Sequence, residues 1–322
     1  MKAVVARAYG PIGNLVYADW PEPEATGGNV VIEAEAIGVN YPDGLLVQGL
    51  YQARPEVPFV PGMEVAGRIA AVGDGVRSVK VGDRVAALLS LGAYAEKVSA
   101  PEAALTKLPE GMDAGDACAL LCGYGTALHA LKQRGQLAAG ETLCVLGASG
   151  LTGLAAVQIG KAMGARVIGV ASSAEKQDIA RQAGADLVIG YDNLRNALKE
   201  ATGGKGVDVA FDPVGGDMFD VLARAMGWNG RLLVVGFASG RIPQLQVNLA
   251  LVKGYSVVGV FWGSFTRNEP EAHAANMRQL IAWYEAGRIK PVIEGIHPLA
   301  EAASVLERIH SRKASGKLIL RP

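Results

Sequence analysis

The chain has 322 residues, enough for one large domain or two average ones, and half of them are hydrophobic. Its 31 lysines and arginines balance 31 aspartates and glutamates, so no net field would attract nucleic acid or an acidic membrane. There is no signal-peptide core and no apolar run of 18 residues, which predicts a soluble cytoplasmic protein.

The first third of the chain is typical of β structure. Short runs rich in valine and alanine, partly alternating with polar residues, are separated by glycine and proline. This pattern predicts a small barrel-like β domain with irregular loops. The expected strands are 3–9, 29–39, 64–72, 83–89 and 93–100.

From about Asp113 the chain becomes helical and then alternates between apolar strands and amphipathic helices. The helices are expected to end at glycines such as Gly164 and Gly184. Apolar runs of this kind, separated by helices, predict a parallel sheet covered on both faces. The expected strands are 142–148, 165–172, 186–191, 206–215, 230–237 and 255–262.

The last part of the chain predicts a discontinuous first domain. Two helical segments, 269–287 and 299–316, precede a final strand at 317–322, which could rejoin the β domain. We therefore expect residues 1–120 plus 265–322 to form one domain, into which the α/β residues 121–264 are inserted.

The stretch "CVLGASGLTGLAAVQIGKAMGARVIGVASSAEK" contains Ala148-x-Gly150-x-x-Gly153, one residue off the usual dinucleotide fingerprint. Gly150 would let the backbone approach a pyrophosphate, Gly153 would let helix and strand pack closely, and free amides at the helix start would hold the anion. The alternative is a tight packing turn without a ligand. The residues expected to bind the cofactor here are Ala148, Ser149, Gly150, Leu151, Thr152 and Gly153.

The end of the second strand, in "VIGVASSAEK", indicates which dinucleotide is bound. An NAD site usually carries Asp or Glu there to hold the ribose diol. Here Ser172 and Ser173 can bond to a 2′-phosphate, and Lys176 adds positive charge. We therefore expect NADPH rather than NADH, although Glu175 opposes this unless it points to solvent. The alternative role for Ser172 is to cap the next helix.

Motifs along the whole chain resemble the medium-chain dehydrogenase/reductase superfamily, specifically its zinc-free quinone oxidoreductase branch. They include "GVNYPDGLLVQGLYQ", "PFVPGMEVAGRI", "GYGTALHAL", "GVDVAFDPVGG", "VVGFASG" and "SGKLIL". The resemblance implies a Rossmann doubly wound parallel sheet domain inserted into a GroES-like β-barrel catalytic domain. It also implies a homodimer in which the cofactor domains pair edge to edge, through segment 255–262.

The resemblance also argues against a metal site. The zinc-dependent relatives carry a ligand cysteine where this chain has Asn40, and a histidine where it has Met63. An amide and a thioether are poor replacements for thiolate and imidazole on Zn²⁺. Cys118 and Cys122 are spaced i, i+4, but no further ligand lies near them, so buried apolar thiols are expected.

The loop "NYPDGLLVQGLY" looks like the substrate-side loop of the family, and its candidate catalytic residues are Tyr51, Asn40 and Asp43. Tyr51 could donate a hydrogen bond or a proton to an enolate or quinol oxygen, or it could be a packed loop aromatic. Asn40 and Asp43 could take part directly, or could only fix the loop through Asx turns.

Further cofactor contacts are implied by the resemblance. Thr126 resembles the residue that meets the nicotinamide carboxamide, or it is a helix-start hydroxyl. Tyr191 resembles the residue near the adenosine phosphate, and Lys317 lies where the family closes over the cofactor cleft. Phe261 and Trp262 are adjacent on an expected strand, so only one need line the cleft. Each of these residues could instead be core or surface. The remaining expected contacts are Gly236 and Phe237.

Together these observations predict a metal-free NADPH:quinone oxidoreductase, whose partner is a small-molecule electron acceptor. One alternative is an NADPH-dependent reductase of activated double bonds, such as an enone or an enoyl thioester. The other is an NADPH-binding protein without turnover.

Overall fold

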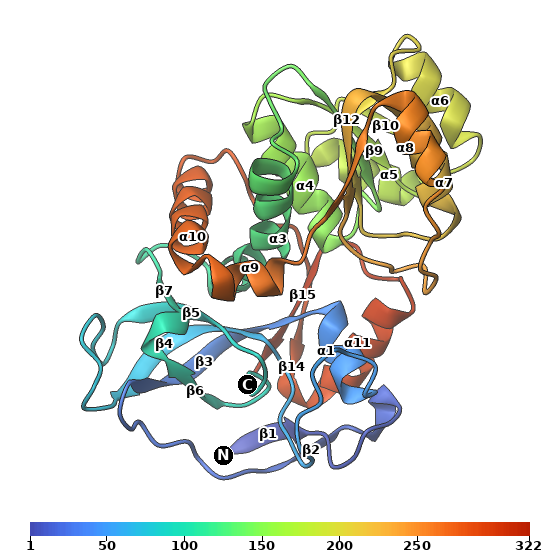
Figure 1. Cartoon of the computed structure of the whole chain (residues 1–322). Helices are drawn as coiled ribbons and strands as arrows, with labels where there is room; N and C mark the ends of the chain where they lie inside the picture. The colour runs from blue at the N-terminus through green and yellow to red at the C-terminus, as the bar shows by residue number, and fades with distance from the viewer. The chain divides into compact units, whose positions relative to one another are not determined.

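The computed structural model describes all 322 residues (Figure 1). The chain divides into two compact units: Met1–Cys122 together with Val292–Pro322, and Gly123–Pro291. None of the helices combines the length and the apolar character needed to cross a membrane.

The first unit is built on a seven-stranded sheet of order β14-β15-β3-β4-β5-β7, with β6 paired to β3. Strand β3 is long, and it pairs with β4 over most of its length, with β6 along its first half and with β15 at its end. The expected return of the terminal strand to the β domain is therefore confirmed. A separate ribbon is formed by β1 and β2. The strands are β1 Lys2–Val5, β2 Val16–Asp19, β3 Asn29–Val39, β4 Glu64–Val72, β5 Arg84–Leu88, β6 Lys97–Pro101, β7 Leu105–Lys107, β14 Ile293–Pro298 and β15 Lys317–Arg321.

Short helices complete the first unit. Helix α11 contacts the loop helix α1, and α2 lies against β3 and β4. A buried cluster, mainly of valines, isoleucines, leucines and alanines, includes Ile32, Val65, Leu306 and Leu318. The helices are α1 Tyr41–Val47, α2 Ala114–Ala119 and α11 Ala302–His310, and the 3₁₀ turns are Ile12–Asn14, Glu102–Ala104 and Leu299–Glu301.

The second unit contains a parallel six-stranded sheet of order β10-β9-β8-β11-β12-β13. Numbered within the unit, this is 3-2-1-4-5-6, the doubly wound order that reverses between its first and fourth strands. The parallel sheet predicted from the apolar runs is confirmed. Its strands are β8 Thr142–Leu146, β9 Arg166–Val170, β10 Leu187–Ile189, β11 Val207–Asp212, β12 Met226–Val234 and β13 Ser256–Gly259.

Helices follow the strands as the sequence pattern indicates. Gly164 and Gly184 adopt φ values of 84° and 106° just after α4 and α5, which is the left-handed conformation that ends a helix. The π-helical segments Leu120–Tyr124 and His129–Arg134 flank α3. The helices are α3 Gly125–Leu128, α4 Leu151–Ala162, α5 Ala174–Gln182, α6 Leu194–Ala201, α7 Asp217–Ala225, α8 Val247–Lys253, α9 Trp262–Asn268 and α10 Pro270–Glu285.

Two features differ from the expectation. Residues 265–291, expected with the first domain, lie in the second unit. There the Phe265 ring stacks on His129 with centroids 3.9 Å apart, and buried Asn276 accepts a hydrogen bond from Gln133 at 2.9 Å. The strand expected at 255–262 ends at Gly259, and helix α9 begins at Trp262.

Candidate cofactor and acceptor sites

The glycine-rich turn joins β8 to α4 at the point where the strand order of the second unit reverses. Gly147 has φ of 60°, and Gly150 caps α4 in an extended conformation without contributing a side chain. The first amides of a helix have no intrahelical acceptor, so those of Leu151, Thr152 and Gly153 remain for a ligand. This end of α4 is suited to an anion.

The glycines of this turn have different surroundings. A Cβ on Gly153 would lie 2.1 Å from the carbonyl oxygen of Gly147, which makes glycine obligatory there. A Cβ on Gly150 would meet nothing closer than that same oxygen at 3.5 Å. Ala148 and Ser149 are buried, and the Ala148 N–H donates to Val170. The turn is thus tightly packed toward the sheet and open at Gly150, as a pyrophosphate-binding site requires.

Tyr191, which follows β10, holds this turn in place. Its hydroxyl accepts a hydrogen bond from the Gly147 N–H at 3.0 Å, and burial raises its pKa. The tyrosine expected near the adenosine phosphate therefore fixes the backbone of the glycine turn directly.

The two serines after β9 have separate roles. The Ser173 hydroxyl accepts from the Lys176 N–H at 3.3 Å and caps helix α5, so the capping role considered for Ser172 belongs to its neighbour. Ser172 is exposed, and Lys176 is half-buried. Glu175 is exposed to solvent, as the expectation of a 2′-phosphate requires.

The carboxyl end of β11 carries a residue that the sequence analysis missed. Asp212 is 1% exposed, and its carboxylate accepts from the N–H groups of Val214 and Gly215 at 2.9 and 2.8 Å. Burial raises its pKa, against these two hydrogen bonds. Its backbone carbonyl accepts from the Gly236 N–H at 3.3 Å, so Asp212 ties together the two loops that follow β11 and β12. The motif "FDPVGG" was its only signal.

The remaining cofactor candidates of the second unit differ in exposure. Phe237 and Phe261 are exposed, and Thr126 is half-buried in α3. Trp262 is buried against Gly125, where a Cβ would come within 2.7 Å of its indole. Phe261 and Trp262 therefore do lie in different environments, although not because they alternate along a strand.

The first unit contains a buried polar cluster around Lys317. The Lys317 ammonium donates to Glu64 Oε2 at 2.6 Å, to Asn40 Oδ1 at 2.9 Å and to the Val39 carbonyl at 3.2 Å. Both Lys317 and Glu64 are 0% exposed. An ammonium has three N–H donors, and all three are used here. Lys317, expected as a cofactor contact, thus has no donor left for a phosphate.

The same cluster fixes Asp43. Its Oδ2 accepts from the Asn40 N–H at 2.8 Å and from the Tyr94 hydroxyl at 2.9 Å. Burial raises the pKa of Asp43 to about 7, even though these hydrogen bonds and Lys317 favour the carboxylate. Burial also raises the pKa of Tyr94. Asp43 therefore caps the start of α1 by accepting from the Asn40 N–H.

Tyr51 lies outside this cluster. It is half-buried and packs against the small apolar group of Ala6, Leu46 and Phe59. No group of three or more His, Cys, Asp or Glu side chains is arranged to hold a metal ion. Cys118 is a buried free thiol and Cys122 a half-buried one.

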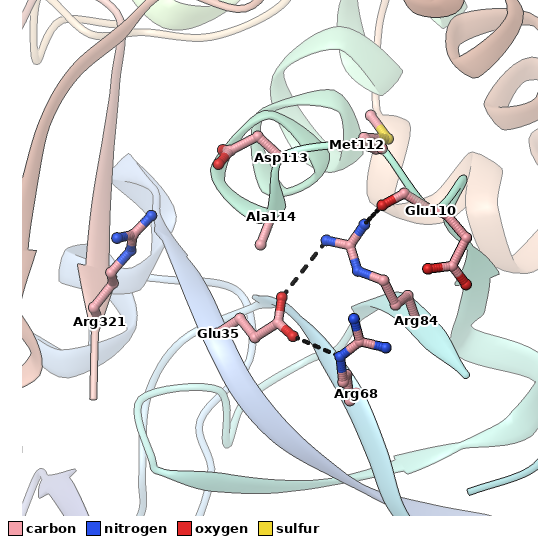
Figure 2. Close-up of a pocket in the computed structure, with 9 residues that line it drawn as sticks. Glu35, Arg68, Arg84, Glu110, Met112, Asp113, Ala114 and Arg321 are labelled. Atoms are coloured by element: carbon pink, nitrogen blue, oxygen red, sulfur yellow. Dashed lines mark hydrogen bonds and ion pairs between the residues drawn. The ribbon is translucent and has the colours of Figure 1, made fainter. Parts of the chain in front are cut away.

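A shallow cavity of about 580 Å³ also lies in the first unit (Figure 2). Glu35 lies between two guanidinium groups there, 3.3 Å from Arg68 and 3.6 Å from Arg84. Arg84 also donates to the carbonyl oxygen of Glu110 at 2.8 Å. Glu35, Arg68 and Arg84 therefore form a structural ion-pair network on the wall of this cavity.

Comparisons with known proteins agree with both units. A family model described as "Alcohol dehydrogenase GroES-like domain" matches residues 26–110, and one described as "Zinc-binding dehydrogenase" matches residues 152–282. A "Quinone oxidoreductase-like protein 2 homolog" of Nematostella vectensis is 37% identical over 95% of this chain and 85% of its own length.

Two solved structures are similar over the full length of both chains. One is the quinone oxidoreductase of Escherichia coli complexed with NADPH, with a TM-score of 0.93 and 28% identity. The other is the quinone oxidoreductase of Thermus thermophilus, solved also in complex with NADPH, with a TM-score of 0.86 and 33% identity.

A GroES-like unit together with a doubly wound parallel sheet defines the medium-chain class of dehydrogenases and reductases. The chain belongs to the medium-chain dehydrogenase/reductase superfamily, in its quinone oxidoreductase branch. The resemblance and the fold class inferred from the sequence motifs are confirmed.

Proposed function

We propose that this oxidoreductase binds NADPH and transfers its hydride to a quinone. The observation that carries the proposal is the glycine turn, closed at Gly153, open at Gly150 and placed at the uncapped start of α4. The NADPH complexes of the Escherichia coli and Thermus thermophilus relatives support the choice of cofactor.

We assign the pyrophosphate to the first turn of α4 and the 2′-phosphate to Ser172, with Lys176 adding positive charge. Tyr191 and Asp212 keep the surrounding loops in place through the hydrogen bonds described above. Bound NADPH supplies the hydride. This chain's own groups bind and orient it, and we assign Asn40 and Tyr51 as the residues that interact with the acceptor.

The second candidate is reduction of an activated carbon–carbon double bond. It is favoured by Tyr51, a half-buried phenol on the acceptor-side loop, since an enolate needs a proton donor more than a quinol does. NADPH oxidation followed at its absorbance, with a panel of quinones, enones and enoyl-CoAs, decides between them. Turnover of quinones alone supports the first proposal, and absence of turnover with every acceptor contradicts both.

We further propose a homodimer formed through the second unit. Strand β13 is the last strand of the sheet and pairs only with β12, so its outer edge has open backbone groups. Five large apolar side chains of this unit are between 72% and 82% exposed: Trp228, Ile242, Val247, Leu251 and Val252. A monomer with so much exposed apolar surface would be prone to associate.

A further inference from the structure

The buried ion pair of the first unit gives the Asn40 side chain a single orientation. Because an ammonium only donates hydrogen bonds, the Asn40 atom 2.9 Å from Lys317 must be the carbonyl oxygen Oδ1. The amide nitrogen Nδ2 then lies on the opposite side of the planar group. That nitrogen is buried and has no hydrogen-bond partner in the protein.

An unpaired buried donor is uncommon and calls for an explanation. The backbone of Asn40 is fixed as well, since its N–H donates to Asp43. Both ends of the residue are therefore held, and only Nδ2 is left without a partner. A donor held in this way resembles the preorganised groups that stabilise a developing oxyanion.

We propose that Glu64 and Lys317 are a positioning pair, which orients Asn40 so that Nδ2 donates to the carbonyl oxygen of the electron acceptor. This inference rests on the proposed reductase function. As the acceptor receives the hydride, an electron pair moves onto that carbonyl oxygen, and water then supplies the proton. The hydrogen bond from Asn40 grows stronger as the oxygen gains charge.

The surroundings of the pair explain why it is rigid. Glu64 Oε1 accepts from the Cys122 N–H at 2.7 Å, in a π-helical turn, while Oε2 bonds to Lys317. Gly38 makes room for both side chains: a Cβ there would lie 2.0 Å from Glu64 Oε2 and 2.8 Å from the Lys317 side chain. Without Glu64, the buried Lys317 side chain would deprotonate or move toward solvent, because burial disfavours the ammonium.

The test is a double-mutant cycle between Asn40 and the pair. Removing one charge leaves the other buried and alone, so the background variant is Glu64→Gln with Lys317→Met, which removes both. In the wild type, Asn40→Ala should lower kcat for a quinone about 10²-fold with little change in KM for NADPH. In the double variant, where kcat is already low, Asn40→Ala should lower it less than about 3-fold.

An equal loss from Asn40→Ala in both backgrounds overturns the positioning role. The matched control is Glu141→Gln with Arg231→Met, which removes the partly buried pair of the second unit whose atoms lie 2.7 Å apart. In that background Asn40→Ala should keep its full effect.

A second readout does not need turnover. With asparagine labelled by ¹⁵N, the two Nδ2 proton signals of Asn40, identified by their absence from Asn40→Ala, should shift or broaden in the double variant, where the amide is no longer held by Lys317. Unchanged signals in the double variant overturn the inference. If none of the acceptors supports oxidation of NADPH by the wild type, the proposed function and the acceptor contact fail together. The orientation of Asn40 is still decided by these signals.

Discussion

Glu64 and Lys317 are separated by 253 residues in the chain, yet their charged groups meet at 2.6 Å with no exposure to solvent. Strand β3 lies between them, since it pairs with β4 on one side and with β15 on the other. The loop that begins at Asn40 follows directly from β3. The ion pair is thus placed to act on the loop that we assign to the acceptor.

The two glycines of the β8–α4 turn should respond differently to alanine. Gly150→Ala should leave the melting temperature unchanged, because its Cβ meets nothing within 3.4 Å, but it should weaken NADPH binding about tenfold or more. Gly153→Ala should lower stability by about 1–3 kcal/mol, because its Cβ would overlap the Gly147 carbonyl. Thermal unfolding and NADPH titration measure the two effects. Unaltered NADPH affinity in Gly150→Ala would place the pyrophosphate elsewhere.

Ser172 should determine the preference between NADPH and NADH. Ser172→Ala should lower kcat/KM for NADPH about tenfold, the value of one hydrogen bond to a charged group, and leave that for NADH unchanged. Ser173→Ala is the less clean variant, since it also removes the cap of α5, worth about 1 kcal/mol. An unchanged ratio of the two kcat/KM values in Ser172→Ala would argue against a 2′-phosphate at this serine.

Asp43 should make stability fall as the pH rises. Its pKa is raised from 3.8 to about 7 by burial, so the folded state holds a proton that the unfolded state releases. Its contribution is fully present below about pH 4 and is lost as the pH rises through 7, by on the order of 4 kcal/mol. Asp43→Asn keeps an acceptor for Tyr94 and for the Asn40 N–H, and should flatten this trend.

Urea unfolding at intervals between about pH 4 and pH 8 measures this difference. Carboxylates with a lowered pKa, such as Glu141 beside Arg231, act in the opposite direction, but they do so equally in both proteins. If the free energy of unfolding changes with pH in the same way in the wild type and in Asp43→Asn, Asp43 is ionised over this whole pH range.

How far the sequence predicted the structure depends on the range of the interactions. The parallel sheet and the glycine turn were predictable, because apolar runs and turn glycines act over a few residues. The cluster of Glu64, Tyr94 and Lys317 was not, because its members come from strands and loops that meet only in the folded unit. The only signal in the sequence was a charged residue at the start of each of two apolar strands: Glu64 in "MEVAG" and Lys317 in "GKLIL". Asp212 was missed although its carboxylate bonds locally, to the N–H groups of Val214 and Gly215; only its link to Gly236 is long-range.

Tyr51 distinguishes the two candidate reactions. If Tyr51 supplies the proton to an enolate, Tyr51→Phe should lower kcat for enones by about 10²-fold or more. Quinone reduction should be almost unaffected, since water can protonate the quinol oxygens. Tyr51 also packs on Phe59 and Leu46, and phenylalanine keeps that contact. Equal losses of kcat with enones and quinones would mean that Tyr51 supports the structure of the loop and does not donate the proton.

The oligomeric state should depend on the exposed apolar side chains next to β13. Charges there should prevent association, because they would be desolvated without a partner. Trp228→Glu combined with Leu251→Glu should therefore be a monomer by light scattering, while the wild type is a dimer. The control is Val81→Glu, a single charge placed at a valine that is 58% exposed in the first unit, and this variant should remain a dimer. A wild type that scatters as a monomer at working concentration contradicts the dimer, and a dimeric Trp228→Glu/Leu251→Glu variant moves the interface away from this surface.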